Sequence, residues 1–319
     1  MTKLRVAVAG ATGTIGRAVV RELLDQGFAT RALGRRKSIA DDSPAIETHV
    51  VNFSDRDEVA AALSECDAVI SCITSRSGTP KDAWSVDHDA NLALMEAAKA
   101  SDTKRFVLLS AICVQKPKLT FQKAKRAFEK QLQLSALDWT IIHPTAFFKS
   151  LSGQVARVQS GKPFLVFDNG TLTACKPISD RDIARFIIQK LTEPSSIRRT
   201  LPIGGPGPAI TPKDQAAMLE RLLGRKVQVR GMPVALMRAI VSVLTLCGRI
   251  IPRFKDRAEF ARTGLYYGTE SMLVWDADAQ RYDAGATPEF GSDTIEDHYA
   301  RLLSGELNAQ LGDHAAFKN

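Results

Sequence analysis

The sequence predicts an α/β fold built on a doubly wound parallel sheet. Short apolar runs alternate with amphipathic segments through the first half of the chain, and each run lies ten or more residues from the next. A glycine-rich turn directly follows the first run. Parallel strands need a crossover of about a dozen residues, usually a helix, and strands covered on both faces are apolar throughout. All three observations therefore favour this fold class.

The six apolar runs are the predicted strands, and helices are predicted between them. Helical spacing is clear in Ile15, Val19 and Leu23, which share one helix face. After Pro144 the pattern changes to smaller helices and strands. We therefore expect a sheet domain over residues 1–150 and a smaller α+β part over 151–319, intertwined with the sheet. The predicted strands are residues 4–9, 28–33, 49–53, 68–73, 106–109 and 140–142.

Local signals in the second half predict one hairpin and two helices. Residues 163–179 suggest a hairpin that turns at 168–170, where Asp-Asn-Gly tolerates positive φ. Ser179 and Asp182 have the spacing of a helix start. Thr211, followed by Pro at the next position, begins a second helix that Gly224 ends.

Composition narrows the class of protein. A chain of 319 residues with 45% hydrophobic and 24% charged residues is typical of a soluble globular protein. The net charge of +8 is spread along the chain without a basic, aromatic-interleaved tract, which argues against nucleic-acid binding. Five cysteines without a C-x-x-C pair indicate reduced core thiols and no metal site. The first strand begins too close to Met1 for a signal segment, so we expect a cytoplasmic protein.

Residues 233–252 are strongly apolar. Arg238 and Arg249 leave ten residues between them, fewer than the roughly twenty that a membrane-spanning helix needs. A buried or cavity-lining helix is the favoured interpretation. The flanking arginines support the alternative, an interfacial helix in peripheral contact with an anionic membrane.

The turn after the first strand predicts a dinucleotide site. Gly10, Gly13 and Gly16 stand between a strand and a helix, where backbone N–H groups can approach a pyrophosphate at the positive end of the helix. Thr12, Thr14 and Ile15 complete this loop. A structural turn without ligand is the alternative interpretation.

The end of the second strand predicts which dinucleotide binds. An NAD site usually has an acid about twenty residues after the glycines, but here the strand ends in Arg31, Arg35, Arg36 and Lys37. Guanidinium groups bind a 2′-phosphate that a carboxylate would repel. The cofactor predicted is therefore NADPH, and a solvated basic loop is the alternative.

The segments "GATGTIG", "RALGR" and "FVLLSA", with a lysine on the next helix, resemble the atypical branch of the short-chain dehydrogenase/reductase superfamily, which has the Rossmann fold. That branch usually has Tyr-x-x-x-Lys, whose phenol protonates a carbonyl oxygen. This chain has Phe121-x-x-x-Lys125, and either Ser110 or Ala111 fits the family's serine position. The resemblance thus implies an intact cofactor site without the carbonyl-reducing acid.

Longer segments, among them "FVLLSAICVQKP", "HPTAFFKSLSGQV" and "LPIGGPGPAITP", resemble the family of divinyl chlorophyllide a 8-vinyl-reductases. The resemblance implies NADPH-dependent reduction of the C8 vinyl group of a magnesium tetrapyrrole, divinyl chlorophyllide or protochlorophyllide, in chlorophyll and bacteriochlorophyll synthesis. Location at a photosynthetic membrane is a further implication. A conjugated macrocycle can take up negative charge, so the missing phenol is consistent with this chemistry.

We assign roles on this basis. Lys125 is the candidate catalytic residue, as a ligand of the nicotinamide ribose and an electrostatic support, and a plain surface lysine is the alternative. The neighbouring Lys123, Arg126 and Lys130 are expected to be surface cations only. His143 is expected to be a packed strand residue and not a magnesium ligand. Further cofactor-binding candidates are Asn52, Ser110, Pro144, Thr145 and Phe147. Substrate-binding candidates are Trp84, Phe121, Phe148, Lys149 and Lys176, with Trp84 and Asp87 near the pocket entrance.

Two other functions are compatible with the sequence. The missing tyrosine also suits an NADPH-sensing regulator that binds cofactor without turnover. A reductase of another conjugated double bond would use the same residues.

Overall fold

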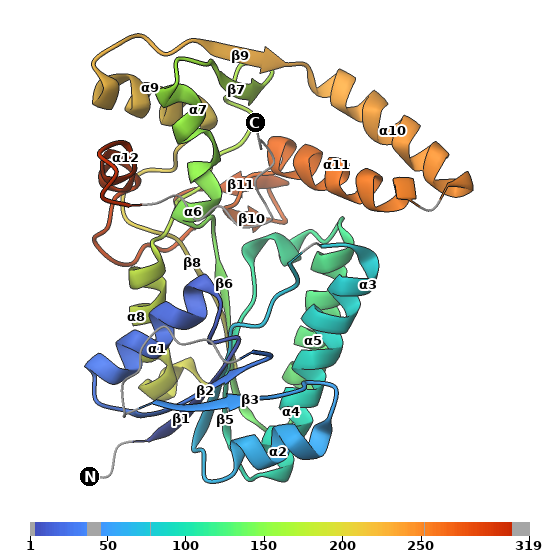
Figure 1. Cartoon of the computed structure of the whole chain (residues 1–319), viewed down its shortest axis with the longest axis vertical. Coiled ribbons are helices and arrows are strands. Elements are labelled where there is room, and N and C mark those ends of the chain that lie inside the picture. Colours follow the sequence, from blue (N-terminus) through green and yellow to red (C-terminus); the bar gives the residue numbers. More distant parts are fainter. Residues whose placement is uncertain (1–3, 37–45, 77, 252, 308–319) are drawn as a thin grey trace. The chain divides into compact units, whose positions relative to one another are not determined.

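The computed structural model describes residues 4–36, 46–76, 78–251 and 253–307 (Figure 1). The chain divides into two compact units that alternate along the sequence. The first comprises residues 1–75, 81–144 and 180–202, and the second comprises 76–80, 145–179 and 203–319. The sequence suggested a boundary near 150 with intertwined parts, and the segment 180–202 is the part that returns to the first unit.

The first unit contains a seven-stranded sheet in the order β3-β2-β1-β4-β5-β6-β8, which confirms the predicted fold class. The first six strands in this order pair in parallel. The order reverses between β1 and β4, the position at which doubly wound sheets bind ligands at the carboxyl ends of their strands. The strands are β1 (Arg5–Ala9), β2 (Ala29–Gly34), β3 (Ile46–Val50), β4 (Ala68–Ser71), β5 (Arg105–Leu109), β6 (Asp138–Pro144) and β8 (Arg199–Ile203).

Helices cover both faces of this sheet (Figure 1). On one face α1 packs against α8, and on the other α2 packs against α4 while α5 packs against the π-helical segment η1. The buried strands contribute fully buried residues such as Val6, Ile70 and Phe106. The helical elements are α1 (Thr14–Asp25), α2 (Arg56–Leu63), α3 (Pro80–Asp82), η1 (Ala83–Ala90), α4 (Asn91–Ala100), η2 (Ile112–Gln115), α5 (Thr120–Leu134), α8 (Asp180–Thr192) and η4 (Pro194–Ser196).

The third strand lies three residues earlier than the sequence predicted. β3 is at the edge of the sheet, and Glu47, Thr48 and Val50 in it are exposed or half-exposed. An edge strand has a solvated side and needs no continuous apolar run. The apolar residues Val51 and Phe53 instead follow the strand and are buried.

The second unit is built from short elements and two small sheets. Strands β7 and β9 pair in parallel, and β10 pairs with β11 in antiparallel fashion. The cap signals of α9 are confirmed: the Thr211 hydroxyl accepts from the Asp214 N–H, and Gly224 ends the helix with φ +61°. Its elements are α6 (Phe148–Leu151), η3 (Ser152–Gln154), α7 (Val155–Gln159), β7 (Phe164–Phe167), α9 (Pro212–Leu223), β9 (Val229–Met232), α10 (Val234–Ile250), α11 (Arg253–Thr269), β10 (Val274–Asp276), β11 (Arg281–Asp283) and α12 (Ile295–Leu303).

The predicted hairpin over 163–179 is wrong. The turn itself forms, with Asp168 at φ +46°, Gly170 at φ +79° and the Gly170 N–H donating to the Phe167 carbonyl. The strand before it pairs with the distant β9, however, and Cys175 forms its bridges with Ile210 and Met272. Local turn chemistry was therefore read correctly, but the partner of β7 lies too far along the chain for a local signal.

The favoured interpretation of 233–252 was a buried or cavity-lining helix, and a buried helix is wrong. Within α10 only Val234 and Gly248 are buried, while Val243 and Leu246 are each 60% exposed. Among the described residues, no helix combines the length and the apolar character needed to cross a membrane.

Candidate cofactor-binding and catalytic site

The loop between β1 and α1 approaches the neighbouring backbone most closely at two glycines. A Cβ atom on Gly10, whose φ is +79°, would lie 2.8 Å from the carbonyl carbon of Cys72, at the end of β4. A Cβ atom on Gly16 would lie 2.2 Å from the Gly10 carbonyl oxygen. Either contact is far inside van der Waals distance, so the loop can keep this path only with glycine at both positions.

The N-terminus of α1 has the features of an anion site. Gly13 is the N-cap and supplies no side-chain cap, and the first turn contains no acidic residue. Thr14 is exposed and Ile15 is half-exposed at this end of the helix. The first N–H groups of a helix and its dipole both favour a phosphate, so the loop fits the pyrophosphate of a dinucleotide.

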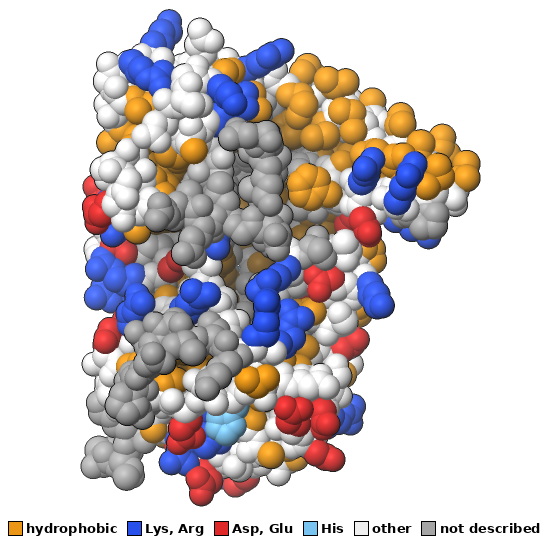
Figure 2. Space-filling model, viewed as in Figure 1, with side chains coloured by type: hydrophobic (Ala, Val, Ile, Leu, Met, Phe, Trp, Pro, Cys, Tyr) orange, Lys and Arg blue, Asp and Glu red, His pale blue; other side chains and the backbone are white. Residues whose placement is uncertain are grey.

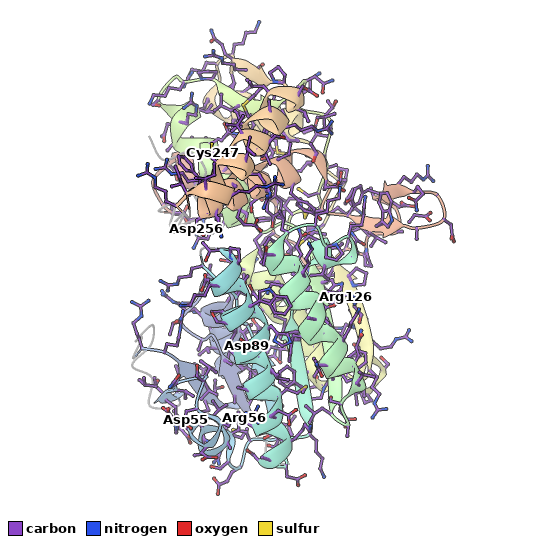
Figure 3. The ribbon with its side chains drawn as sticks, turned by 90° about the vertical axis from the view of Figure 1, so that its right-hand side faces the viewer. Asp55, Arg56, Asp89, Arg126, Cys247 and Asp256 are labelled. Carbon is purple, nitrogen blue, oxygen red and sulfur yellow. The ribbon has the colours of Figure 1, made fainter. Side chains whose placement is uncertain are left out.

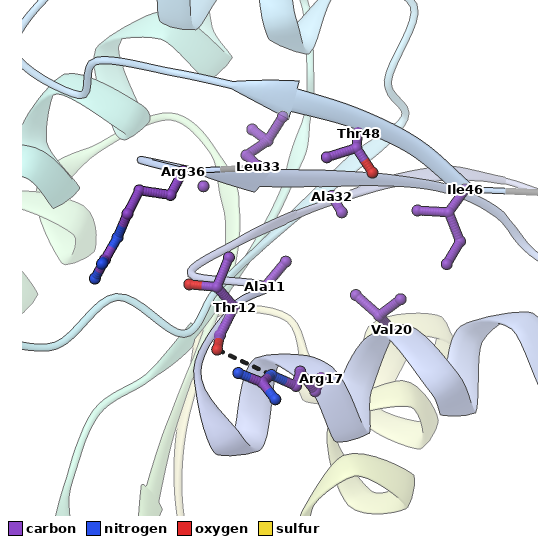
Figure 4. A pocket seen from close by; sticks show the side chains of 10 residues that line it. Ala11, Thr12, Arg17, Val20, Ala32, Leu33, Arg36, Ile46 and Thr48 are labelled. Atoms are coloured by element: carbon purple, nitrogen blue, oxygen red, sulfur yellow. Dashed lines mark hydrogen bonds between the residues drawn. The ribbon is translucent and has the colours of Figure 1, made fainter. Parts of the chain in front are cut away.

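A recess lies between this loop, β2 and the start of α1 (Figure 4). Arg17 and Arg36 are the cationic residues that line it, and the Arg17 Nε–H donates to the Thr12 carbonyl over 3.0 Å. The recess is therefore electropositive and lies beside the phosphate-binding loop. Its lining consists of Ala11, Thr12, Arg17, Val20, Ala32, Leu33, Gly34, Arg36, Ile46 and Thr48.

The four cations near the end of β2, of which Arg35 and Arg36 are the predicted cofactor ligands, do not share one environment. Arg35 and Arg36 are exposed at the end of β2, and Lys37 lies outside the described residues. Arg31 is buried and forms an ion pair of 2.7 Å with Glu47, its register partner on β3. The Arg31 guanidinium also donates to the Ala62 and Ser64 carbonyls, so Arg31 is a structural residue and does not add to the cations available for a phosphate.

The candidate catalytic lysine is buried in an ion pair. Lys125 Nζ on α5 lies 2.9 Å from Asp87 Oδ1 on η1, and the two side chains are 9% and 0% exposed. Asp87 Oδ1 also accepts from the Thr74 hydroxyl and the Ser75 N–H, and Oδ2 accepts from the Ser75 hydroxyl over 2.6 Å. Thr74 and Ser75 follow β4, so the pair is anchored at the carboxyl edge of the sheet, beside the switch point.

Asp87 was expected near a pocket entrance, and that expectation is wrong because the residue is 1% exposed. It lies in a π-helical segment, a rare geometry that often marks functional sites. The Asn91 side chain supports this segment, since its Nδ2 donates to the Val86 and Asp87 carbonyls and its Oδ1 accepts from the Ser71 hydroxyl. Figure 3 labels Asp89 on η1 and Arg126 on α5 and shows the two elements side by side.

A second buried polar cluster lies one turn further along α5. Glu129 Oε1 accepts from the Ser110 hydroxyl over 2.5 Å and lies 2.8 Å from His143 Nε2, while Oε2 lies 3.0 Å from Arg126 Nη1. Burial acts to raise the pKa of Glu129, but His143, Ser110 and Arg126 outweigh it and hold that pKa below its usual value. Ser110 and His143 thus bind Glu129, and His143 is a packed strand residue, as expected.

The remaining first-unit candidates are more accessible. Phe121 is half-exposed one turn before Lys125, and Trp84 is 42% exposed with its ring against His88. Asn52 is exposed just after β3, where its side-chain oxygen accepts from the Ser54 N–H. Pro144 is buried at the end of β6. Lys123 and Lys130 are exposed, as expected of surface lysines.

The other candidates belong to the second unit. The Thr145 N–H donates to the Ile203 carbonyl, and its hydroxyl donates to the Lys176 carbonyl. Phe147 bridges to Ile178. Lys176 is 6% exposed, and its ammonium lies 2.5 Å from Glu289. That ion pair, together with the Gly207 N–H, lowers the pKa of Glu289. The charge of Lys176 is thus already compensated within this unit.

Phe148 and Lys149 open α6 in the second unit. Phe148 is buried, with its ring 5.3 Å from that of His298, whereas Lys149 is half-exposed. Phe148 is therefore a packing residue in this structure.

Comparison with known proteins finds relatives that cover most of the chain. The family model described as NAD(P)H-binding matches residues 10–194. The chloroplastic divinyl chlorophyllide a 8-vinyl-reductase of Oryza sativa subsp. indica is 42% identical, over 98% of this chain and 82% of that protein. Its namesake from Arabidopsis thaliana is 41% identical, over 97% and 79%. The chain belongs to the divinyl chlorophyllide a 8-vinyl-reductase family.

A solved structure supports the fold independently. The NADPH complex of the quinone oxidoreductase QOR2 of Escherichia coli superimposes with a TM-score of 0.69, at 17% identity, over 95% of this chain and 100% of that one. The family match identifies residues 10–194 as a binding domain for a nicotinamide cofactor. That range begins at Gly10 and includes the recess and the Lys125–Asp87 pair.

Sequence reasoning missed two features of this site. Arg17 was not among the predicted phosphate ligands, although its place directly after Gly16 puts it on the first turn of α1 beside the loop. The Asp87–Lys125 pair was also missed, because its partners are far apart in the sequence and only the packing of α5 on η1 brings them together.

Proposed function

We propose that the chain reduces the C8 vinyl group of a divinyl chlorophyllide or protochlorophyllide, a magnesium tetrapyrrole, to ethyl with NADPH as reductant. The observation that carries this proposal is the 42% identity to an enzyme of that name over nearly the whole chain. The magnesium ion belongs to the substrate. When bound, NADPH supplies the hydride, and a proton completes the conversion of –CH=CH2 to –CH2CH3.

The preference for NADPH is inferred from the cations that line the recess. Arg36 and Arg17 line it at the end of β2 and the start of α1. Two guanidinium groups there would pair with a 2′-phosphate, whereas NADH offers only hydroxyls at this position. Glu47 on the neighbouring strand β3 is already paired with Arg31. NADPH should therefore bind more tightly than NADH.

Lys125 is the residue we assign to the reaction. An ammonium has three donors, so it can bind Asp87 and the ribose hydroxyls of the nicotinamide at the same time. Asp87 fixes the direction of the Lys125 side chain, and its own position is fixed by Thr74 and Ser75. The result is an ammonium held at the carboxyl edge of β4, where it can orient the cofactor for hydride transfer.

Phe121 stands where a phenol would serve as the acid, and the proposed substrate does not require that acid. Negative charge that develops on a vinyl group of a conjugated macrocycle spreads over that macrocycle, so a phenol beside a single oxyanion is not required. An apolar ring at Phe121 also offers a flat surface to a flat pigment and helps to exclude water.

The test is an absorbance assay on the pure protein with NADPH and each divinyl pigment. Loss of a conjugated vinyl group shifts the main absorption band to the blue. Lys125→Met should slow this shift strongly, to a small residual rate, and largely spare NADPH binding, while Lys123→Met, an exposed lysine of the same helix, should behave as wild type. NADPH binding without any shift would instead indicate a regulator without turnover, and turnover only of other conjugated alkenes would reject the tetrapyrrole.

A further inference from the structure

The helix α10 has one face against α11 and another that is exposed. The contact with α11 is close, because a Cβ atom on Gly248 would lie 3.3 Å from the backbone nitrogen of Lys255. Arg262 on α11 donates to the Thr245 hydroxyl on α10 over 2.9 Å. Figure 3 labels Cys247 on α10 and Asp256 on α11, which run beside each other. The two helices therefore pack closely, and this packing holds α10 in place.

That exposed face is continuous and aliphatic. Its side chains follow one another at intervals of three or four residues, which places them on a single face of the helix. Their exposed fractions are high: Leu236 53%, Ile240 40%, Val243 60%, Leu246 60% and Ile250 82%. We call these five residues the α10 apolar face. Figure 2 shows the orange side chains gathered over α10, and soluble proteins seldom leave such a patch uncovered without a function.

The charges around this face are almost all positive. α10 itself contains Arg238 and Arg249, both exposed, and no acidic residue. The first turns of α11 add three exposed cations, Arg253, Lys255 and Arg257, against the single exposed acid Asp256. Arg253 and Arg257 also lie over the Phe254 ring, 5.5 Å from its centre. On α10 itself, Arg238 and Arg249 lie together on one flank of the helix, beside the aliphatic face. An aliphatic face with cations along one flank is complementary to a bilayer with anionic headgroups.

We propose that the α10 apolar face docks onto the surface of a bilayer that contains anionic lipid, with the helix lying in the plane of the interface. The 17 residues of α10 extend about 25 Å, and Arg238 and Arg249 divide its apolar sequence, so the helix lies on the bilayer without crossing it. The arginine stems can lie along the acyl boundary while their guanidinium groups reach the phosphates.

A second copy of the chain fits this surface less well. A two-fold interface places the same patch of both copies face to face, so the cations beside α10 would meet their own copies across the axis. The face also lacks the tyrosines and tryptophans that usually anchor protein interfaces. Lipid requires no defined register and supplies the opposite charge.

Vesicle flotation of the full chain tests the proposal. The protein should float with vesicles of phosphatidylcholine mixed with phosphatidylglycerol, more weakly with phosphatidylcholine alone, and less as salt increases. Val243→Asp should weaken binding at least about ten-fold, since it replaces a buried apolar contact with a charge. Arg249→Glu should weaken binding to the anionic vesicles about five-fold or more and change binding to phosphatidylcholine little.

Leu134→Asp is the matched control. Leu134 is a single apolar residue, 87% exposed at the end of α5 in the other unit, and its replacement should leave flotation unchanged. Circular dichroism of each variant establishes that it is folded. Undiminished flotation of folded Val243→Asp would overturn the proposal. The proposal would also be overturned if the wild-type protein bound neither kind of vesicle and formed a dimer, seen by light scattering, that Val243→Asp dissociates.

Discussion

The ion pair between Lys125 and Asp87 can be tested by a double-mutant cycle on stability. Asp87→Asn replaces a carboxylate that is 1% exposed and accepts from the Lys125 ammonium, Thr74 and Ser75. The new amide directs N–H donors toward one of these donor groups and leaves the Lys125 charge uncompensated. Breaking a buried pair from one side costs about 3–5 kcal/mol, and we expect a decrease of that size in the free energy of unfolding.

Lys125→Met should cost less, about 1–3 kcal/mol. Methionine occupies similar space, and the Asp87 carboxylate keeps its hydrogen bonds from Thr74 and Ser75. The double variant has no unpaired buried charge. Its loss should therefore be smaller than the sum of the single losses by about 1–3 kcal/mol, measured by urea unfolding followed by circular dichroism. Losses that add within about 0.5 kcal/mol would refute the pair as an energetic unit.

The same cycle has a kinetic readout. If Asp87 acts by positioning Lys125, Asp87→Asn should reduce kcat in the wild-type background and have no further effect once Lys125 is methionine. Asp89→Asn is the matched control, because Asp89 lies on the same segment η1 with a side chain that is 65% exposed and contacts only the neighbouring His88 among the ion pairs described. Independent effects of Asp87→Asn and Lys125→Met on kcat would contradict this role.

Three further predictions concern the surrounding residues. Because the pKa of Glu129 lies below its ordinary 4.5, its ionised form contributes stability above pH 4.5. This contribution is lost as the pH falls toward the lowered pKa. The free energy of unfolding should therefore fall more steeply below pH 4.5 for wild type than for Glu129→Gln, measured by acid titration. Gly16→Ala should reduce cofactor affinity more than ten-fold by fluorescence titration, whereas Gly13→Ala, whose added Cβ would lie at 3.3 Å, should have a smaller effect. Arg36→Glu should raise the KM for NADPH at least about ten-fold and leave that for NADH nearly unchanged; equal changes would exclude contact with the 2′-phosphate.

The features that depend only on residues close together in the chain could be predicted from the sequence. Strand runs such as 4–9 and the capping box of Thr211 depend on nearby residues alone, and both appear in the structure. The partner of β7 and the exposure of α10 depend on which distant segment covers them, and both predictions failed. β3 shows the intermediate case, because its edge position permits polar residues that hide a strand from a search for apolar runs.

In the candidate site, too, features set by nearby residues could be predicted and features set by distant residues could not. The glycines of the first loop could be predicted because their reason is local, a turn too tight for any Cβ atom. Arg31 could not be told from its neighbours Arg35 and Arg36 in the sequence, whereas its register opposite Glu47 makes it structural. Register between strands is fixed by the whole sheet, and a short motif does not contain it.

The pairing of Lys125 also bears on the kind of substrate that suits this site. An unpaired buried ammonium would strongly stabilise a full negative charge on one oxygen, but Asp87, 2.9 Å away, offsets much of that field. The pair is thus poorly suited to replace the phenol that Phe121 lacks in a carbonyl reduction. It is well suited to hold a cofactor in place beside an acceptor that disperses its own charge. The same two residues therefore argue for a conjugated alkene over a ketone, on physical grounds separate from family membership.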